Sequence, residues 1–129
     1  MAYLVDTCVL IDHLTGRLPS AVQGMLERLV AAGEVCTSAV VYHELMTGAQ
    51  TTRAREAVEH LLAAWEVLPV DVVVARDAAG IRRRRRAQGR TIAMADALIA
   101  ATARVHHLTV MTGNVKDFPD VATEDLSGM

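Results

Sequence analysis

Short β-type runs alternate with helical segments along the 129-residue chain, and this alternation constrains the fold more than any other feature. Strands separated by helices are expected to run parallel, because each helix carries the chain back across the sheet. A parallel sheet needs helices on both faces to cover it. We see no repeat and no interdomain linker. The sequence therefore predicts one α/β domain over residues 1–129, with a short parallel β-sheet sandwiched by α-helices.

The expected strands are short and rich in aliphatic residues: Tyr3–Val5, Val35–Thr37, Glu66–Leu68, His107–Thr112 and a short one near Val121. The expected helices have apolar residues at helical spacing or begin at a capping residue. They are Thr7–Leu14, Ala21–Ala32, Ser38 to Gly48, Arg53–Ala64, Asp71 to near Gly89, and Thr91 or a neighbour through Ala103. Ser38 and Asp71 are expected to be N-caps, and Gly33 is expected to end the second helix.

The composition excludes several classes of protein. A hydrophobic fraction of 52% indicates a full core and excludes disorder. The chain has one Phe, one Trp and two Tyr, so stacking on exposed bases is not a main route to nucleic-acid binding. The N-terminus has an acidic residue and no basic segment, which excludes a signal peptide. No apolar run reaches the ~20 residues of a membrane span. We expect a cytoplasmic protein.

Four acidic residues are the candidates for chemistry: Asp6, Glu44, Asp96 and Asp117. Asp6 ends the first strand, Glu44 lies in the helix after the second strand, and Asp117 follows the last core strand. Ligands of open α/β sheets bind at that edge. Asp96 interrupts an apolar helix near its first turn. Carboxylates near a core are costly unless neutralised, and without convergent His or Cys this set favours Mg²⁺ or Mn²⁺.

Structural interpretations of the same acids stay open. Asp6 is also suited to cap the helix that follows it, and the amides at a helix N-terminus are suited to hold Asp96. The pair His43-Glu44 invites a comparison with the zinc motif HExxH. That motif fails because the position of its second His is Thr47. A zinc site is therefore not expected.

Five arginines run consecutively from Arg82 to Arg86. Such a run is often a solvated helix face. Consecutive helical residues point about 100° apart, however, so some of these guanidinium groups must turn towards the protein or a partner. Arginine suits RNA phosphates or an acidic partner, because its planar fork donates two parallel hydrogen bonds. Arg82 and Arg86 are the candidates for substrate contacts.

Four segments between positions 3 and 118 resemble, in order and spacing, the successive motifs of PIN-domain ribonucleases. They are LVDTCVLIDHL, SAVVYHELMTG, ADALIAATA and LTVMTGNVKDF. More narrowly, they are similar to the VapC toxins of bacterial toxin–antitoxin pairs. The resemblance implies a PIN fold with an acidic Mg²⁺ or Mn²⁺ site. It also implies an endoribonuclease in which metal-activated water cleaves RNA, leaving 5′-phosphate and 3′-hydroxyl ends.

The resemblance also assigns roles to the acids. Asp6, Glu44 and Asp96 match the three acidic positions of the family. Asp117 is our assignment for the fourth, and Asn114 occupies a nearby position that is acidic in some relatives. Asp6 and Asp96 would be the principal metal ligands, with Glu44 and Asp117 completing the shell. Four crowded carboxylates without metal are expected to raise the pKa of at least one of them.

Polar side chains at the same edge of the sheet are candidates for contacts with RNA. Thr7, Thr112 and Asn114 carry hydroxyl and amide groups and are candidates for substrate binding. One departure from the family is Cys8, where relatives commonly have Asn after Asp-Thr. A thiol cannot replace the hydrogen bonds of an amide, which puts any contact made there in question.

The family also implies partners. A VapB-like antitoxin would lay its tail in a groove leading to the site and place an Arg or Lys among the carboxylates. A homodimer is expected, and a heterotetramer or larger assembly with the antitoxin. The apolar side chains of Val40, Val41, Tyr42 and Leu45 suit a dimer interface, but plain core is the better interpretation from sequence alone.

Two other classes compete with the nuclease. One is a catalytically inactive PIN-like scaffold, although all four acids are present. The other is a phosphotransfer domain of similar sheet topology. A haloacid-dehalogenase-like phosphatase expects a second Asp where this chain has Cys8. A receiver domain needs an acidic pair and a late-strand Lys, whereas Asp6 stands alone and Lys116 lies past the last strand.

Overall fold

The computed structural model describes residues 1–126; the last three residues of the predicted domain, 127–129, lie outside that range. Five strands form one sheet in the order β3-β2-β1-β4-β5. Every neighbouring pair is parallel, as predicted. The strands are β1 (Tyr3–Val5), β2 (Val35–Ser38), β3 (Glu66–Leu68), β4 (Thr109–Thr112) and β5 (Thr123–Asp125).

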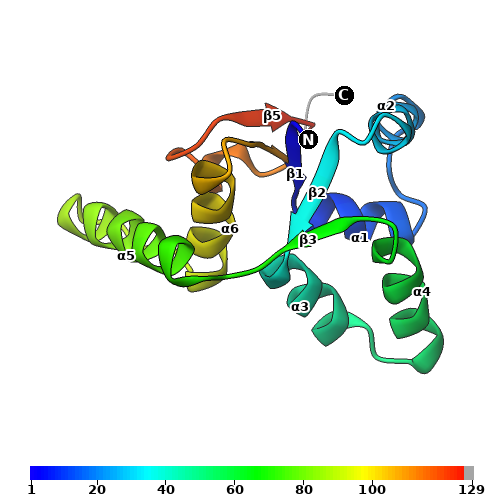
Figure 1. Ribbon diagram of the computed structural model, residues 1–129, viewed down its shortest axis with the longest axis horizontal. Helices are drawn as coiled ribbons and strands as arrows, with labels where there is room; N and C mark the ends of the chain where they lie inside the picture. Colours follow the sequence, from blue (N-terminus) through cyan, green and yellow to red (C-terminus); the bar gives the residue numbers. More distant parts are fainter. Residues whose placement is uncertain (127–129) are drawn as a thin grey trace.

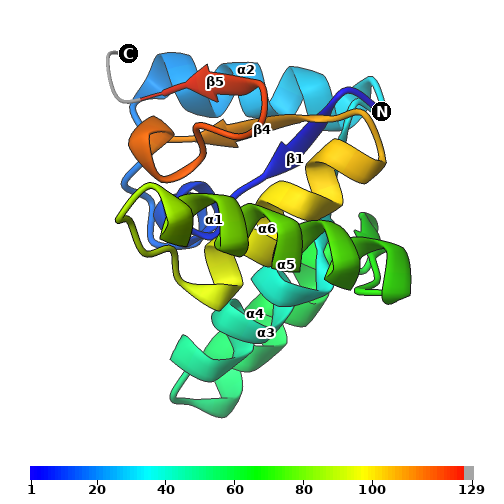
Figure 2. The ribbon, with the colours of Figure 1, turned by 90° about the vertical axis from the view of Figure 1, so that its left-hand side faces the viewer.

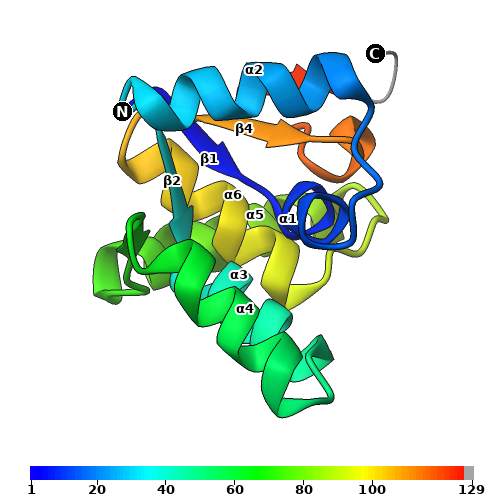
Figure 3. The same ribbon diagram turned by 90° about the vertical axis from the view of Figure 1, so that its right-hand side faces the viewer.

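Helices cover both faces of the sheet, which confirms the predicted sandwich. They are α1 (Thr7–Leu14), α2 (Ser20–Ala31), α3 (Ala39–Gly48), α4 (Thr52–Leu62), α5 (Val72–Ala87) and α6 (Met94–Val105), with a 3₁₀ turn η1 (Val115–Asp117). Helices α5 and α6 lie on one side of β1 and β2, and α1, α2 and α4 lie on the other (Figures 1 and 3). Within residues 1–126, no helix is long and apolar enough to cross a membrane.

Local signals in the sequence set most element ends. The Ser38 side chain accepts a hydrogen bond from the Val41 amide at 3.1 Å, and Asp71 accepts one from the Val74 amide at 2.9 Å. Both predicted N-caps are confirmed. Gly33 follows the end of α2 with φ of +71°, the left-handed conformation that glycine adopts without strain.

Two predicted starts, those of α6 and β4, were wrong by two or three residues, and the predicted bounds of β2, α2, α4, β5 and the end of α6 differ from the observed ones by one or two. Helix α6 begins at Met94 and not at Thr91, because Ala93 is extended (φ −62°, ψ 146°) and serves as the N-cap. Strand β4 begins at Thr109 and not at His107. His107 has φ of +56°, and its amide donates to the Arg104 carbonyl at 3.3 Å, so it still belongs to the turn that ends α6.

The core is aliphatic and centres on β1, β4 and α6. Leu4, Val5, Val110 and Met111 are fully buried, and so are Ala97 and Ile99–Ala101 of α6. Small alanines let α6 pack closely against its neighbours. The α3 residues Val41 and Leu45 are buried core residues, which confirms the core interpretation for these two positions.

The sheet order places a topological switch point where the site was predicted. From β1 the chain moves to β2 and β3 on one side of the sheet, and β4 and β5 lie on the other side. The order therefore switches between β1 and β4, and ligands of such sheets bind beyond the carboxyl ends of the strands at the switch. Asp6 and Thr112 stand at those two ends.

Candidate active site

Asp6 is fixed at the switch point by both of its carboxylate oxygens. The register pairs Val5 with Met111, so the residues that follow, Asp6 and Thr112, are neighbours. The Thr112 hydroxyl donates to Asp6 Oδ2 at 2.9 Å, and the Thr7 amide donates to Oδ1 at 2.8 Å. Asp6 is also the N-cap of α1, which confirms the capping interpretation. With 7% of its surface exposed, it is a buried carboxylate with a fixed orientation.

Thr112 and Cys8 both contact the Oδ2 atom of Asp6. Thr112 is fully buried, and its hydroxyl accepts a hydrogen bond from the Asn114 amide at 3.0 Å. The Cys8 thiol lies 3.5 Å from Asp6 Oδ2 and 3.8 Å from the Thr112 hydroxyl. Burial raises the pKa of the Cys8 thiol, so the protonated form is favoured as a weak donor. The thiol thus contacts Asp6 directly, at the position where the family resemblance led us to expect Asn.

Glu44 joins the site from α3. The Thr7 hydroxyl donates to Glu44 Oε1 at 2.6 Å and links the start of α1 to α3. Glu44 also lines a groove of about 700 Å³ between α3, the start of α6 and the segment before α5. Val40, Met94 and Leu98 supply apolar walls of that groove. The Glu44 carboxylate therefore lies where an apolar groove meets the acidic rim, by which we mean the four acids Asp6, Glu44, Asp96 and Asp117.

Asp96 lies in the first turn of α6 and is half-buried. No side chain caps this helix. Burial raises the pKa of Asp96 above its usual value, and the negative charges of Asp117, Asp6 and Glu44 raise it further. Burial likewise raises the pKa of Asp6; the hydrogen bonds from Thr112 and Thr7 oppose that shift, and the Glu44 charge adds to it. The expected pKa increase is confirmed, with burial as its first cause and like charge as a further one.

The four acids share one electrostatic field but do not close around one point. Among residues 1–126, no three His, Cys, Asp or Glu side chains gather closely enough to hold one ion together. The donor set nevertheless fits a hard divalent cation, because Mg²⁺ binds one or two carboxylates and keeps several waters. A cation would also favour the charged forms of Asp6 and Asp96, which burial disfavours.

Asp117 and Asn114 have different surroundings. Asp117 ends η1, is half-buried, and is the foremost of the charges that raise the pKa of Asp96. Asn114 is exposed, and its side chain does not cap η1. Asn114 lines a different groove, together with Cys8 and Leu18. The charge that acts on Asp96 from this segment therefore comes from Asp117.

The arginine run divides as its helical geometry predicts. Arg83, Arg84 and Arg86 are exposed, Arg82 is half-buried, and Arg85 is buried. Arg85 forms an ion pair with Asp120 at 2.8 Å. Sequence reasoning did not single out this pair. The available signal was spacing, because Arg85 follows the buried Ile81 by one helical turn.

The protein without metal is expected to lose stability as the pH rises above about 3.9, the usual Asp value. The raised pKa values of Asp6 and Asp96 mean that the folded state binds more protons than the unfolded state, up to the folded pKa values. Stability from these groups is therefore full at low pH and falls as they ionise. Asp96→Asn should remove part of that loss, so the variant should gain stability relative to wild type as the pH rises.

Urea unfolding from pH 4 to 8 in EDTA would measure this difference, with Asp12→Asn in α1 as the matched control. A saturating metal ion should reverse the loss in the wild type, by about 2.7 kcal/mol at one hundred times its Kd. Parallel pH profiles for the wild type and Asp96→Asn in EDTA would contradict the expectation.

Comparison with known proteins agrees with this arrangement. A family model described as PIN domain matches residues 3–124. The chain is 41% identical over 116 residues to "Ribonuclease VapC10" of Mycobacterium tuberculosis, covering 90% of this chain and 85% of that protein. It is 28% identical over 134 residues to "tRNA(fMet)-specific endonuclease VapC" of Shigella flexneri, covering 98% and 99% of the two chains.

A solved structure shows the same architecture over nearly the whole chain. It is the crystal structure of DNA-bound VapBC from Salmonella typhimurium, with a TM-score of 0.84, 25% identity, and 98% of both chains covered. The sheet order, the acids at the switch point and these matches lead to one conclusion: the chain belongs to the PIN domain family, together with the VapC ribonucleases.

Proposed function

We propose that this protein is a single-domain, metal-dependent endoribonuclease and the toxin of a toxin–antitoxin pair. The observation that carries the proposal is the placement of Asp6. This buried carboxylate lies at the switch point of the sheet, and its negative charge is one of those that raise the pKa of Asp96. The 41% identity to a ribonuclease supports RNA as the substrate.

Asp6 and Asp96 are proposed as the residues that hold Mg²⁺ or Mn²⁺, with Glu44 and Asp117 completing the acidic rim. When bound, the ion supplies Lewis acidity and an activated water for attack on phosphorus. The protein supplies orientation. Thr112 fixes one oxygen of Asp6, and Thr7 fixes one oxygen of Glu44. The expected products carry 5′-phosphate and 3′-hydroxyl ends.

Substrate contacts are proposed for side chains that solvent can reach. Asn114 and Arg86 are exposed, and Thr7 and Arg82 are half-buried. Arginines at the end of α5 offer phosphate contacts beside the acidic rim. This end of the helix is near the rim, because Arg85 of the same run is close enough to Asp96 for its charge to act on that carboxyl group. Thr112 is fully buried, so we reassign it from substrate binding to the positioning of Asp6.

A VapB-like antitoxin is the proposed inhibitory partner, since a structural relative is a VapBC complex. The groove beside Glu44 has the chemistry for an antitoxin tail. Its walls include Val40 and Met94, and Met94 is 62% exposed. An apolar segment that ends in Arg or Lys would bury this surface and place its charge at the acidic rim. We propose a homodimer that joins the antitoxin in a heterotetramer or larger assembly in the cytoplasm.

The test is brief expression of the wild type and of Asp96→Asn in a bacterial host, followed by mapping of RNA 5′-monophosphate ends across the transcriptome. New ends at a few sites are expected with the wild type alone, because the variant lacks one proposed metal ligand. Transfer RNA should be included, because one relative is named for it. Folded, antitoxin-free wild type that creates no new ends would favour the scaffold alternative.

A further inference from the structure

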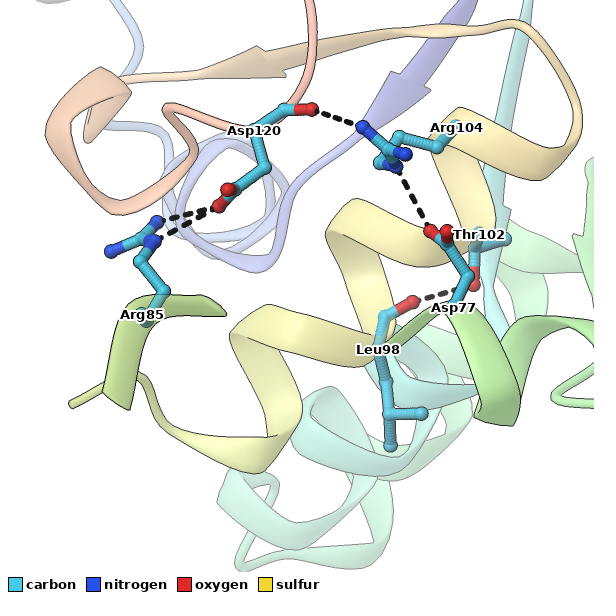
Figure 4. Close-up of polar contacts among 6 residues, drawn as sticks. All are labelled: Asp77, Arg85, Leu98, Thr102, Arg104 and Asp120. Carbon is cyan, nitrogen blue, oxygen red and sulfur yellow. Dashed lines mark hydrogen bonds and ion pairs between the residues drawn. The ribbon is translucent and has the colours of Figure 1, made fainter. Parts of the chain in front are cut away.

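Arg85 and Asp120 form the more buried of the two ion pairs found within residues 1–126. Their side chains are 9% and 17% exposed, against 38% and 25% for Arg104 and Asp77. Both Nε and Nη2 of Arg85 donate to Asp120 Oδ2, at 3.0 and 2.8 Å (Figure 4). Two donors on one oxygen restrict the direction of the contact as well as its length.

Residue 120 is also held through its backbone. Arg104 Nη1 donates to the Asp120 carbonyl at 2.9 Å, and Arg104 Nε donates to Asp77 at 2.9 Å (Figure 4). Asp77 and Arg85 belong to α5, whereas Arg104 belongs to α6. Two helices therefore fix the same point of the connection between β4 and β5.

That connection carries the fourth acid of the site. Asp117 lies three residues before Asp120, and the buried Phe118 lies between them. Two backbone hydrogen bonds hold η1: the Asp117 amide donates to the Asn114 carbonyl, and the Phe118 amide donates to the Val115 carbonyl, both at 3.0 Å. A shift of Asp120 would therefore pass to Asp117 through a short, stiff segment. Figure 2 shows the end of α5 next to the turn that contains η1.

The same arginine lies within electrostatic range of the acids. Arg85 and Asp117 both lie close enough to Asp96 for their charges to act on its carboxyl group. Arg85, Asp96 and Asp117 are thus neighbours in one field, although Arg85 bonds neither of these two acids.

We propose that Arg85 is a positioning residue for the acidic site: through Asp120 it holds the η1 turn so that Asp117 is presented to Asp96. The inference rests on the proposed function, because it concerns the same metal site. A buried ion pair adds little net stability over apolar packing, so its directional hydrogen bonds are the property that apolar side chains would not replace.

The test measures Mn²⁺ binding without RNA, by electron paramagnetic resonance of the free ion. Arg85→Met should weaken Mn²⁺ binding about tenfold or more, the range found when residues that orient metal ligands are changed. Asp120→Asn keeps the shape of the side chain and should weaken binding in the same direction by less. Arg83→Met removes an exposed arginine of the same helix and should bind as the wild type does.

RNA affinity separates positioning from direct phosphate contact. Binding of a short RNA is measured against salt concentration without metal, in the Asp96→Asn background. Positioning predicts that Arg85→Met leaves the salt slope unchanged, whereas loss of a phosphate contact would flatten it by about 0.7. A flattened slope would overturn the proposal.

Wild-type Mn²⁺ affinity in folded Arg85→Met would overturn the proposal as well. If thermal unfolding shows that Arg85→Met does not fold, Asp120→Asn decides in its place, and unchanged Mn²⁺ affinity there has the same meaning. Wild type that neither binds Mn²⁺ nor cuts RNA would overturn the proposed function too. Unchanged affinity in the variants, with an active wild type, overturns the role of Arg85 alone.

Discussion

Asp6→Asn is expected to lower the rate of RNA cleavage by about 10³-fold or more while the protein stays folded. A metal ion contributes several kcal/mol of charge stabilisation to a phosphoryl transition state, and each 1.36 kcal/mol is tenfold in rate. Asn has the shape of Asp and keeps an oxygen for the Thr7 amide, so α1 keeps its cap. The variant loses one negative charge at the point where Thr112 fixes the carboxylate.

Single-turnover cleavage of a mapped RNA substrate, at saturating Mg²⁺ and again at saturating Mn²⁺, measures this effect. Asp12→Asn is the matched control, because Asp12 is a half-buried acid of the same α1 helix and is not among the charges that raise the pKa of Asp6 or Asp96. The control should cleave at the wild-type rate. A loss of less than tenfold in Asp6→Asn, with the control at the wild-type rate, would remove Asp6 from the proposed ligands.

Phe118→Ala is expected to destabilise the protein by about 3–5 kcal/mol, the usual cost of emptying a buried aromatic site. Phe118 is the only Phe of the chain and is 1% exposed. It lies directly after η1, so the same cavity should loosen the turn that carries Asp117. A chain of this size should show a fall in Tm of about 10 °C or more.

Chemical unfolding at fixed pH measures the loss, and Phe118→Leu serves as the control because it keeps an apolar side chain in the same space. The control is expected to lose less stability than the alanine variant, since a smaller cavity remains. Equal losses in the two variants would show that the volume of the side chain is not what holds this segment. A loss below about 1 kcal/mol in Phe118→Ala would show that the site collapses and that η1 does not depend on it.

Elements with strong local signals were predictable from the sequence. The bounds predicted for β1, α1 and β3 are those observed, and the caps Ser38 and Asp71 act as expected. These features depend on hydrophobic spacing and on side chains that bond the amides next to them. The start of α6 was missed because no side chain caps it, so the sequence near Ala93 holds no comparable signal.

The candidate acids were predictable for a related reason. Asp6, Asp96 and Asp117 adjoin apolar segments, and a carboxylate beside a buried segment is visible in the sequence alone. The alternation of strands and helices also places strand ends at one edge of a parallel sheet. What remained open was which neighbours hold each carboxylate. Thr112 was visible as a polar residue after a strand, but its burial against Asp6 depends on β4 pairing with β1.

The sequence by itself determined the fold class, most helix and strand ends, and the acids that are candidates for the metal site, because these depend on short-range pattern. The tertiary structure decided the strand order, which places β4 beside β1 and Thr112 against Asp6. It also decided which arginine of a uniform run turns inward, since Arg85 meets Asp120 across 35 positions of the chain. Contacts between residues so far apart in the sequence depend on how helices pack and in which register strands align. Neither can be predicted from a local stretch of residues.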